Sequence, residues 1–146
     1  MSQIRIREVW RDEDADDLRR LAVTVDDGTS SFTSEVYVVD AALAEAVEGL
    51  DRFRHQIHGG IFDLRLGEFG PEFAGGAFHA RLNFAAPGRL FITTRQESEF
   101  MDRPTGGSAA ATARLYLRSE PALLDRWIDQ LRNMVAQGSE AVLECV

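Results

Sequence analysis

Apolar and polar residues alternate along most of the chain, which is the pattern of strands that bury one face. The alternation predicts seven strands, over residues 3–10, 20–25, 34–39, 62–66, 78–84, 90–94 and 112–118. Because polar residues fill every second position, we expect antiparallel sheet with one face on a core and the other toward solvent. The segment 141–146 is predicted to add a short edge strand.

Two segments have the three- and four-residue apolar spacing of amphipathic helices instead. The first covers residues 41–54 and follows Asp40, a favourable N-cap. The second is expected to be capped by Ser119 and to end at Gly138. Its apolar stripe is the most regular in the chain and includes Trp127, for which we expect complete burial.

This order of elements predicts an α+β fold class in a single domain, residues 1–146, with about seven antiparallel strands in one or more sheets and two amphipathic helices. Each helix follows a strand with a central tyrosine, Tyr37 or Tyr116, and two further strands precede each of these. One interpretation is a pseudo-repeat of two βββα units with an extra strand, 62–66, between them. The other is a chance similarity of strand-to-helix boundaries.

Composition narrows the classes of partner. The chain has 146 residues and a formal net charge of -8. This excess of acid disfavours nucleic acid, which requires a basic surface, and favours a basic protein. We find no apolar run that could span a membrane and no secretory signal. With Cys145 as its one cysteine, the chain is expected to be cytoplasmic and not associated with a membrane.

An acidic turn between the first two predicted strands is the first candidate site. Its acids are Asp12, Glu13, Asp14, Asp16 and Asp17. Their spacing begins like a calcium-binding EF-hand loop, but the glycine and the closing glutamate of that loop are missing. Three interpretations stay open: a solvated hairpin tip, a docking patch for a basic protein, and a loose divalent site.

No arrangement of residues indicates catalysis. A nucleophile with a base and an orienting acid is missing, as is a glycine loop for phosphate. His55 and His58 are three residues apart at the end of the first predicted helix, where histidine is favoured by the helix dipole. We therefore predict no catalytic residue, no metal and no cofactor.

The segment Phe69–Gly76 contains two phenylalanines and three glycines between predicted strands. Phe69 and Phe73 could fold over the core as a lid, or they could anchor a protein contact. Both interpretations stay open.

A ligand-binding site is the alternative to a protein-binding surface. Arg65, His79 and Arg81 occupy polar positions of two predicted strands, and they face the same side if those strands pair in register. Such a site would make the chain a small-ligand-binding protein, or an enzyme with a pocket between sheet and helices. A homodimeric scaffold is a third alternative.

Three motifs carry a resemblance to a family. They are the strand with Tyr37 and Val39 that leads into a helix at Asp40, the segment Phe69–Gly76, and the Leu124–Trp127 sequence of the last helix. The chain from Phe32 to Met134 resembles small uncharacterised bacterial proteins, some of which are immunity-like proteins of polymorphic toxin systems. The resemblance implies a non-catalytic module that binds and blocks a cognate toxin, and the acidic turn would bind a basic partner of this kind. We expect a monomer or homodimer. The resemblance implies no functional residue.

Overall fold

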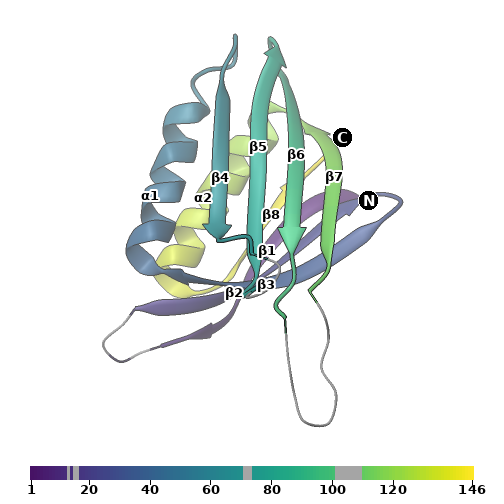
Figure 1. Cartoon of the computed structure of the whole chain (residues 1–146). Helices are drawn as coiled ribbons and strands as arrows, with labels where there is room; N and C mark the ends of the chain where they lie inside the picture. Colours follow the sequence, from purple (N-terminus) through teal and green to yellow (C-terminus); the bar gives the residue numbers. More distant parts are fainter. Residues whose placement is uncertain (13, 15–16, 71–73, 101–109) are drawn as a thin grey trace.

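The computed structural model describes residues 1–12, 14, 17–70, 74–100 and 110–146. In these residues it has eight strands and two helices (Figure 1). In chain order they are β1 (Ser2–Arg11), β2 (Leu18–Asp27), β3 (Ser31–Val39), α1 (Asp40–Phe53), β4 (Ile61–Gly67), β5 (Ala77–Ala86), β6 (Arg89–Glu97), β7 (Thr112–Ser119), α2 (Pro121–Gln137) and β8 (Glu140–Glu144). The predicted α+β class is confirmed. The structure has eight strands where about seven were predicted, and the eighth, β8, is the short strand expected near the C-terminus.

The strands form two antiparallel sheets, with the orders β3-β2-β1-β8 and β4-β5-β6-β7. Each half of the chain runs through three strands, a helix and a fourth strand. The fourth strand does not join its own half: β4 follows α1 and pairs with β5, while β8 follows α2 and pairs with β1. Each sheet is therefore completed by a strand from the other half.

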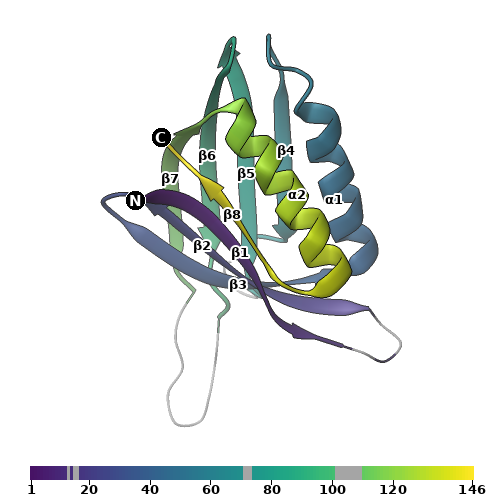
Figure 2. The ribbon, with the colours of Figure 1, turned by 180° about the vertical axis from the view of Figure 1, so that it is seen from behind.

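The two sheets and both helices enclose one core. Figure 1 looks onto the outer face of the β4–β7 sheet with α2 behind it, and Figure 2 shows α2 from the opposite side, next to β8. Buried apolar side chains from both sheets and both helices form one cluster. Trp127 lies in this cluster and is 0% exposed. The outer faces of the sheets carry the polar residues of the alternation.

Helix α1 starts one residue earlier than predicted. Asp40 is its first helical residue, and the N-cap position belongs to Val39, which makes no side-chain cap. The carboxylate of Asp40 is bound by Arg19 of β2, so it is not free to cap the helix. The Asp40 carboxylate thus forms an ion pair with Arg19 instead of the predicted N-cap hydrogen bond to the backbone of α1.

Helix α2 also differs at its start. Glu120 is the N-cap residue, whereas Ser119 ends β7 and donates a hydrogen bond of 2.8 Å to the carbonyl oxygen of Glu144. Its predicted end is confirmed, because Gly138 takes the left-handed conformation at φ 66° and donates to Met134. In the described part of the chain, neither helix is long and apolar enough to cross a membrane.

Candidate functional site

A β-bulge in β1 turns Trp10 away from the core. Ile4 and Ile6 are buried, so strict alternation would bury Trp10 on the same face. The register of β1 with β2 shifts between Glu8 and Trp10, and after the shift Trp10 lies opposite Arg20. Trp10 is 47% exposed there. Bulges often redirect a side chain at a functional site, and tryptophan is a frequent anchor of protein interfaces.

Tyr37 and Arg20 lie beside Trp10 on the outer face of β1–β3. Arg20 is opposite both Trp10 and Tyr37 in the register, so these three residues form one row across three strands, here called the Trp10 row. The Arg20 guanidinium lies 5.1 Å from the centroid of the Tyr37 ring, and its Nη1 donates a 3.1 Å hydrogen bond to the Tyr37 hydroxyl. Glu35 and Glu99 form ion pairs with the same guanidinium. Tyr37 is therefore held in place while 39% of it stays exposed.

The acidic turn begins directly after the Trp10 row and Arg11. The structure describes Asp12, Asp14 and Asp17 of this turn, whereas Glu13 and Asp16 lie outside the described residues. The Asp14 amide donates a 2.9 Å hydrogen bond to the Asp12 carboxylate. The carbonyl oxygen of Asp17 accepts a 3.0 Å hydrogen bond from the first amide of α1. The end of the turn is thus attached to the helix, and Asp14 and Asp17 are exposed.

Phe69 lies on the outer face of the β4–β7 sheet. The Arg95 guanidinium stands over its ring, 4.1 Å from the centroid, and Phe69 is not part of the buried apolar cluster. The lid interpretation is therefore wrong for Phe69, and Phe73 lies outside the described residues. Gly76, at the end of this segment, has φ +90°, and a Cβ atom there would collide with the backbone oxygen of Glu35. This glycine is needed for close approach to β3.

Arg65, His79 and Arg81 lie around Asp63 on the outer face of β4 and β5. Arg81 donates to the two Asp63 carboxylate oxygens at 2.9 and 3.1 Å, and His79 Nε2 is 2.8 Å from Oδ1. Arg65 Nη2 is 3.9 Å from Oδ2. The hydrogen bonds from Arg81, aided by His79, lower the pKa of Asp63 to about 2, although partial burial opposes this shift. The structure thus brings the three basic residues onto one face around an acid.

Asp63 should make part of the stability pH-dependent. Its pKa is about 2 in the folded protein and about 3.9 in an unfolded chain. Ionised Asp63 therefore stabilises the fold above pH ~4, and this contribution is lost as the pH falls toward ~2. We expect Asp63→Asn to cost about 1 to 2 kcal/mol at neutral pH and clearly less near pH 3. Urea unfolding of both proteins across this range tests it; a difference independent of pH would contradict the assignment.

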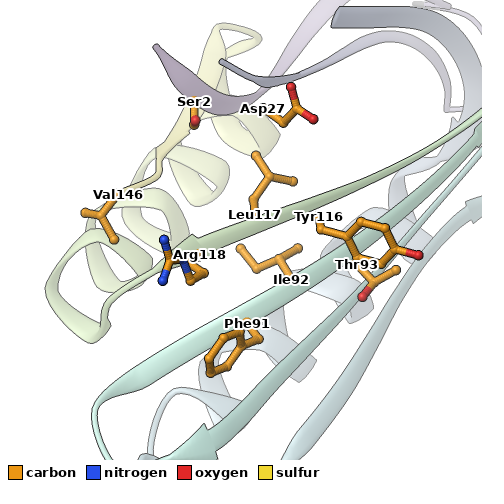
Figure 3. A pocket seen from close by; sticks show the side chains of 9 residues that line it. All are labelled: Ser2, Asp27, Phe91, Ile92, Thr93, Tyr116, Leu117, Arg118 and Val146. Carbon is orange, nitrogen blue, oxygen red and sulfur yellow. The ribbon is translucent and has the colours of Figure 1, made fainter. Parts of the chain in front are cut away.

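Two open grooves adjoin these faces. One, of about 350 Å³, lies between α1 and β4 and includes Asp63 and Arg65 but not His79 or Arg81. The other, also about 350 Å³, follows β7 toward the ends of β1 and β2 (Figure 3). It is lined by residues that include Phe91, Tyr116, Arg118, Asp27 and Val146.

Metal and thiol chemistry in the described part of the chain depends on its His, Cys, Asp and Glu side chains, which include one cysteine. Among these residues, no three His, Cys, Asp or Glu side chains lie close enough together to hold a metal ion. Burial raises the pKa of the Cys145 thiol to about 12, so the thiol is protonated at neutral pH.

The Trp10 row is the site that pattern reasoning overlooked. A tryptophan in an alternating strand is normally assigned to the core, and only the bulge places Trp10 outside it. One signal was present in the sequence: Trp10 lies two residues before the acidic turn. An aromatic residue next to a cluster of acids is a candidate contact residue on sequence grounds alone.

The fold and these faces define an α+β protein with two four-stranded antiparallel sheets whose outer faces carry aromatic and charged residues. Comparison with protein-family models, curated proteins and solved structures found no match for the chain. Functional assignment therefore depends on the chemistry of the two outer faces.

Proposed function

We propose that the chain is a non-catalytic protein-binding module, immunity-like in its action, which binds a basic protein such as a cognate toxin. The observation that carries this proposal is the exposed Trp10, which a bulge turns out of the core next to Tyr37, Arg20 and the acidic turn. Tryptophan, tyrosine and arginine are the residues most enriched at the energetic centres of protein interfaces. All three occur here in one row.

The contacts within the row support binding of a partner. Arg20 holds Tyr37 by a cation–π contact and a hydrogen bond, and Glu35 and Glu99 hold Arg20. A side chain that is already ordered loses less conformational entropy when a partner binds. Arg20 and Tyr37 are thus ordered before the partner binds.

The acidic turn gives the surface its selectivity for a basic partner. Asp14 and Asp17 are exposed next to the Trp10 row, and Asp12 begins the turn. Carboxylates at the edge of an interface mainly increase the rate of association with a positively charged partner and disfavour acidic ones. Screening by salt should therefore slow association more than it changes dissociation.

The partner would first be identified by affinity purification of the tagged chain from its own cells at low and high salt. We then expect Trp10→Ala to weaken binding to the purified partner by about 30-fold or more, because the variant removes the central apolar anchor. Tyr116→Ala is the control, since Tyr116 is another exposed aromatic residue, on the other sheet. Calorimetry with both variants measures the effect. Equal binding by native chain and Trp10→Ala would contradict the proposal.

A charge variant tests the acidic turn separately. Asparagine at Asp12, Asp14 and Asp17 keeps the shape of the turn and its side-chain acceptors, and asparagine tolerates the positive φ of 48° at Asp17. The variant should associate more slowly with the same partner and depend less on salt, with little change in the dissociation rate. An association rate equal to that of the native chain would exclude the turn from the binding surface.

A ligand-binding role is the second candidate. The observation in its favour is the groove between α1 and β4, with Arg65 at its rim next to the cluster of His79, Arg81 and Asp63. Against it, Asp63 already engages these cations within the chain. A thermal-shift screen of anionic metabolites, repeated with His79 and Arg81 replaced by alanine, tests this role. A ligand that binds there should raise the melting temperature of the native chain but not that of the variant.

Two further proposals concern the setting of this module. We propose that it acts in the cytoplasm, as a monomer or homodimer, in agreement with its single, protonated cysteine.

We also propose that the two halves are a βββα pseudo-repeat. The identical order of strands and helix in both halves supports this, and the strand that follows each helix extends the unit.

A further inference from the structure

The outer face of the β4–β7 sheet carries a row of basic residues that crosses all four strands. Arg65 of β4 lies opposite His79, His79 opposite Arg95, and Arg95 opposite Arg114 of β7. We call this the cationic row. Strands are spaced about 4.8 Å apart, so the four positions span about 14 Å. The face is open to solvent in Figure 1, with α2 on the opposite side of the sheet.

This face differs in charge from the rest of the molecule. Two further rows lie on one side of the cationic row, first Asp63, Arg81, Thr93 and Tyr116 and then Ile61, Asn83, Phe91 and Arg118; on its other side lies the row Gly67, Ala77, Glu97 and Thr112. Five arginines against Asp63 and Glu97 give these four rows a formal charge of +3, so with a total of -8 the remainder of the chain carries -11. Segregation of this size creates a local positive potential on an acidic protein.

The cationic row is an unfavourable arrangement for the isolated chain. Arg95 and Arg114 are directly opposite each other on neighbouring strands, and like charges in such pairs destabilise a sheet. No acid lies within 4.0 Å of either guanidinium among the described residues, whereas Arg65 and Arg81 reach Asp63. The nearby Glu97 is buried and accepts a hydrogen bond from the Gly70 amide. Anions from a partner would relieve this repulsion.

Aromatic side chains lie beside the arginines on this face. The ring of Phe69 lies against Arg95 and supports its guanidinium at the surface. Tyr116 is 66% exposed and Phe91 41% exposed, and both border the groove along β7 (Figure 3). A partner that fits this face therefore has carboxylates for the arginine forks and apolar side chains for the aromatic rings.

We propose that this face is a second interaction surface, which binds an acidic segment of a protein through Arg95 and Arg114. The mixture of arginines with Tyr116 and Phe91 matches a segment in which acidic and apolar residues alternate. A nucleic acid fits less well, because its phosphates would extend past this face toward the rest of the chain, which carries a formal charge of -11, and an acidic protein repels long polyanions. The proposal is independent of the Trp10 row, which lies on the other sheet.

The test uses fluorescence anisotropy with a labelled peptide of alternating glutamate and valine, about ten residues long, which covers the row when extended. The full chain should bind this peptide in about 0.05 M salt and more weakly in about 0.3 M salt. Arg95→Gln with Arg114→Gln should weaken binding about tenfold or more. The matched control is Arg5→Gln with Arg7→Gln, which removes the same charge from exposed positions of β1 and should bind as the native chain does.

Two further probes make the outcome decisive. The same peptide with lysine for glutamate should not bind, and a labelled oligothymidylate should bind more weakly than the acidic peptide. Urea unfolding should show that Arg95→Gln with Arg114→Gln is at least as stable as the native chain, because the variant removes the repulsion between these two residues, so lost binding is not lost folding. No binding of the acidic peptide, equal losses in both variant pairs, or tighter binding of the oligonucleotide would each overturn the proposal.

Discussion

Replacing Arg19 with methionine is expected to lower the free energy of unfolding by about 3 to 5 kcal/mol. Arg19 is 2% exposed, and its guanidinium forms ion pairs with Asp40 and Glu8. It also donates hydrogen bonds of 3.0 and 2.6 Å to the carbonyl oxygens of Met134 and Val135. Methionine would fill a similar volume but would leave these acids and carbonyls without their cation. Removing one partner of a buried charge network is costly for this reason.

The position of Arg19 explains why one side chain has such a large effect. It extends from β2 and reaches the first residue of α1 and the last turn of α2 at once. The last turn of α2 contains no basic residue of its own. Arg19 therefore supplies the positive charge that favours the C-terminal end of a helix dipole. The hydrogen bond from Arg19 also lowers the pKa of Asp40, so the ion pair stays charged in mild acid.

Urea unfolding at neutral pH measures this prediction. Arg7→Met is the matched control, because Arg7 is exposed on the adjacent strand β1 and its loss should change stability by no more than about 0.5 kcal/mol. If Arg19→Met cost less than about 1 kcal/mol, the buried network would not be what joins the two helices to the first sheet.

Replacing Trp127 with alanine should cost about 3 to 5 kcal/mol. Trp127 is 0% exposed and belongs to the cluster shared by both sheets and both helices. Its removal leaves a cavity that the surrounding strands cannot fill by a small shift, because they are tied by their sheet hydrogen bonds. Thermal or urea unfolding measures the loss.

The variant Trp127→Phe separates the contribution of the ring volume to stability from that of the indole N–H group. The indole nitrogen of Trp127 is buried and has no hydrogen-bond partner among the described residues. Phenylalanine loses volume but also removes this unsatisfied donor, so its cost should be less than half that of alanine. A phenylalanine variant as unstable as the alanine variant would mean that the nitrogen has a partner, such as an ordered water.

The elements of the fold were predictable because alternation and helical spacing are local. The helix expected over 41–54 is Asp40–Phe53, and the strand expected over 62–66 is Ile61–Gly67. The partner of each strand was not predictable. The alternation of apolar and polar residues predicts which face of a strand is buried, but it does not predict which strand lies beside it. The pairings of β4 with β5 and of β8 with β1 therefore could not be predicted.

For the candidate sites too, the face on which a residue lies was predictable, whereas its neighbours on other strands were not. Alternation placed Arg65, His79 and Arg81 on polar positions, but their meeting at Asp63 depends on the register of β4 with β5. The cationic row requires two more registers, those of β5 with β6 and β6 with β7. Trp10 escaped prediction because one extra residue in a bulge reverses which face its side chain occupies.

The exchange of strands between the halves has a consequence for synthesis on the ribosome. The nascent chain makes β1 first, but β8, which pairs with it, emerges after every other strand and helix. Until then the first sheet exposes the unpaired backbone of β1, which is a template for intermolecular pairing. We expect the nascent chain to depend on chaperones over this interval, and folding to be slow for its size, because such distant segments must meet.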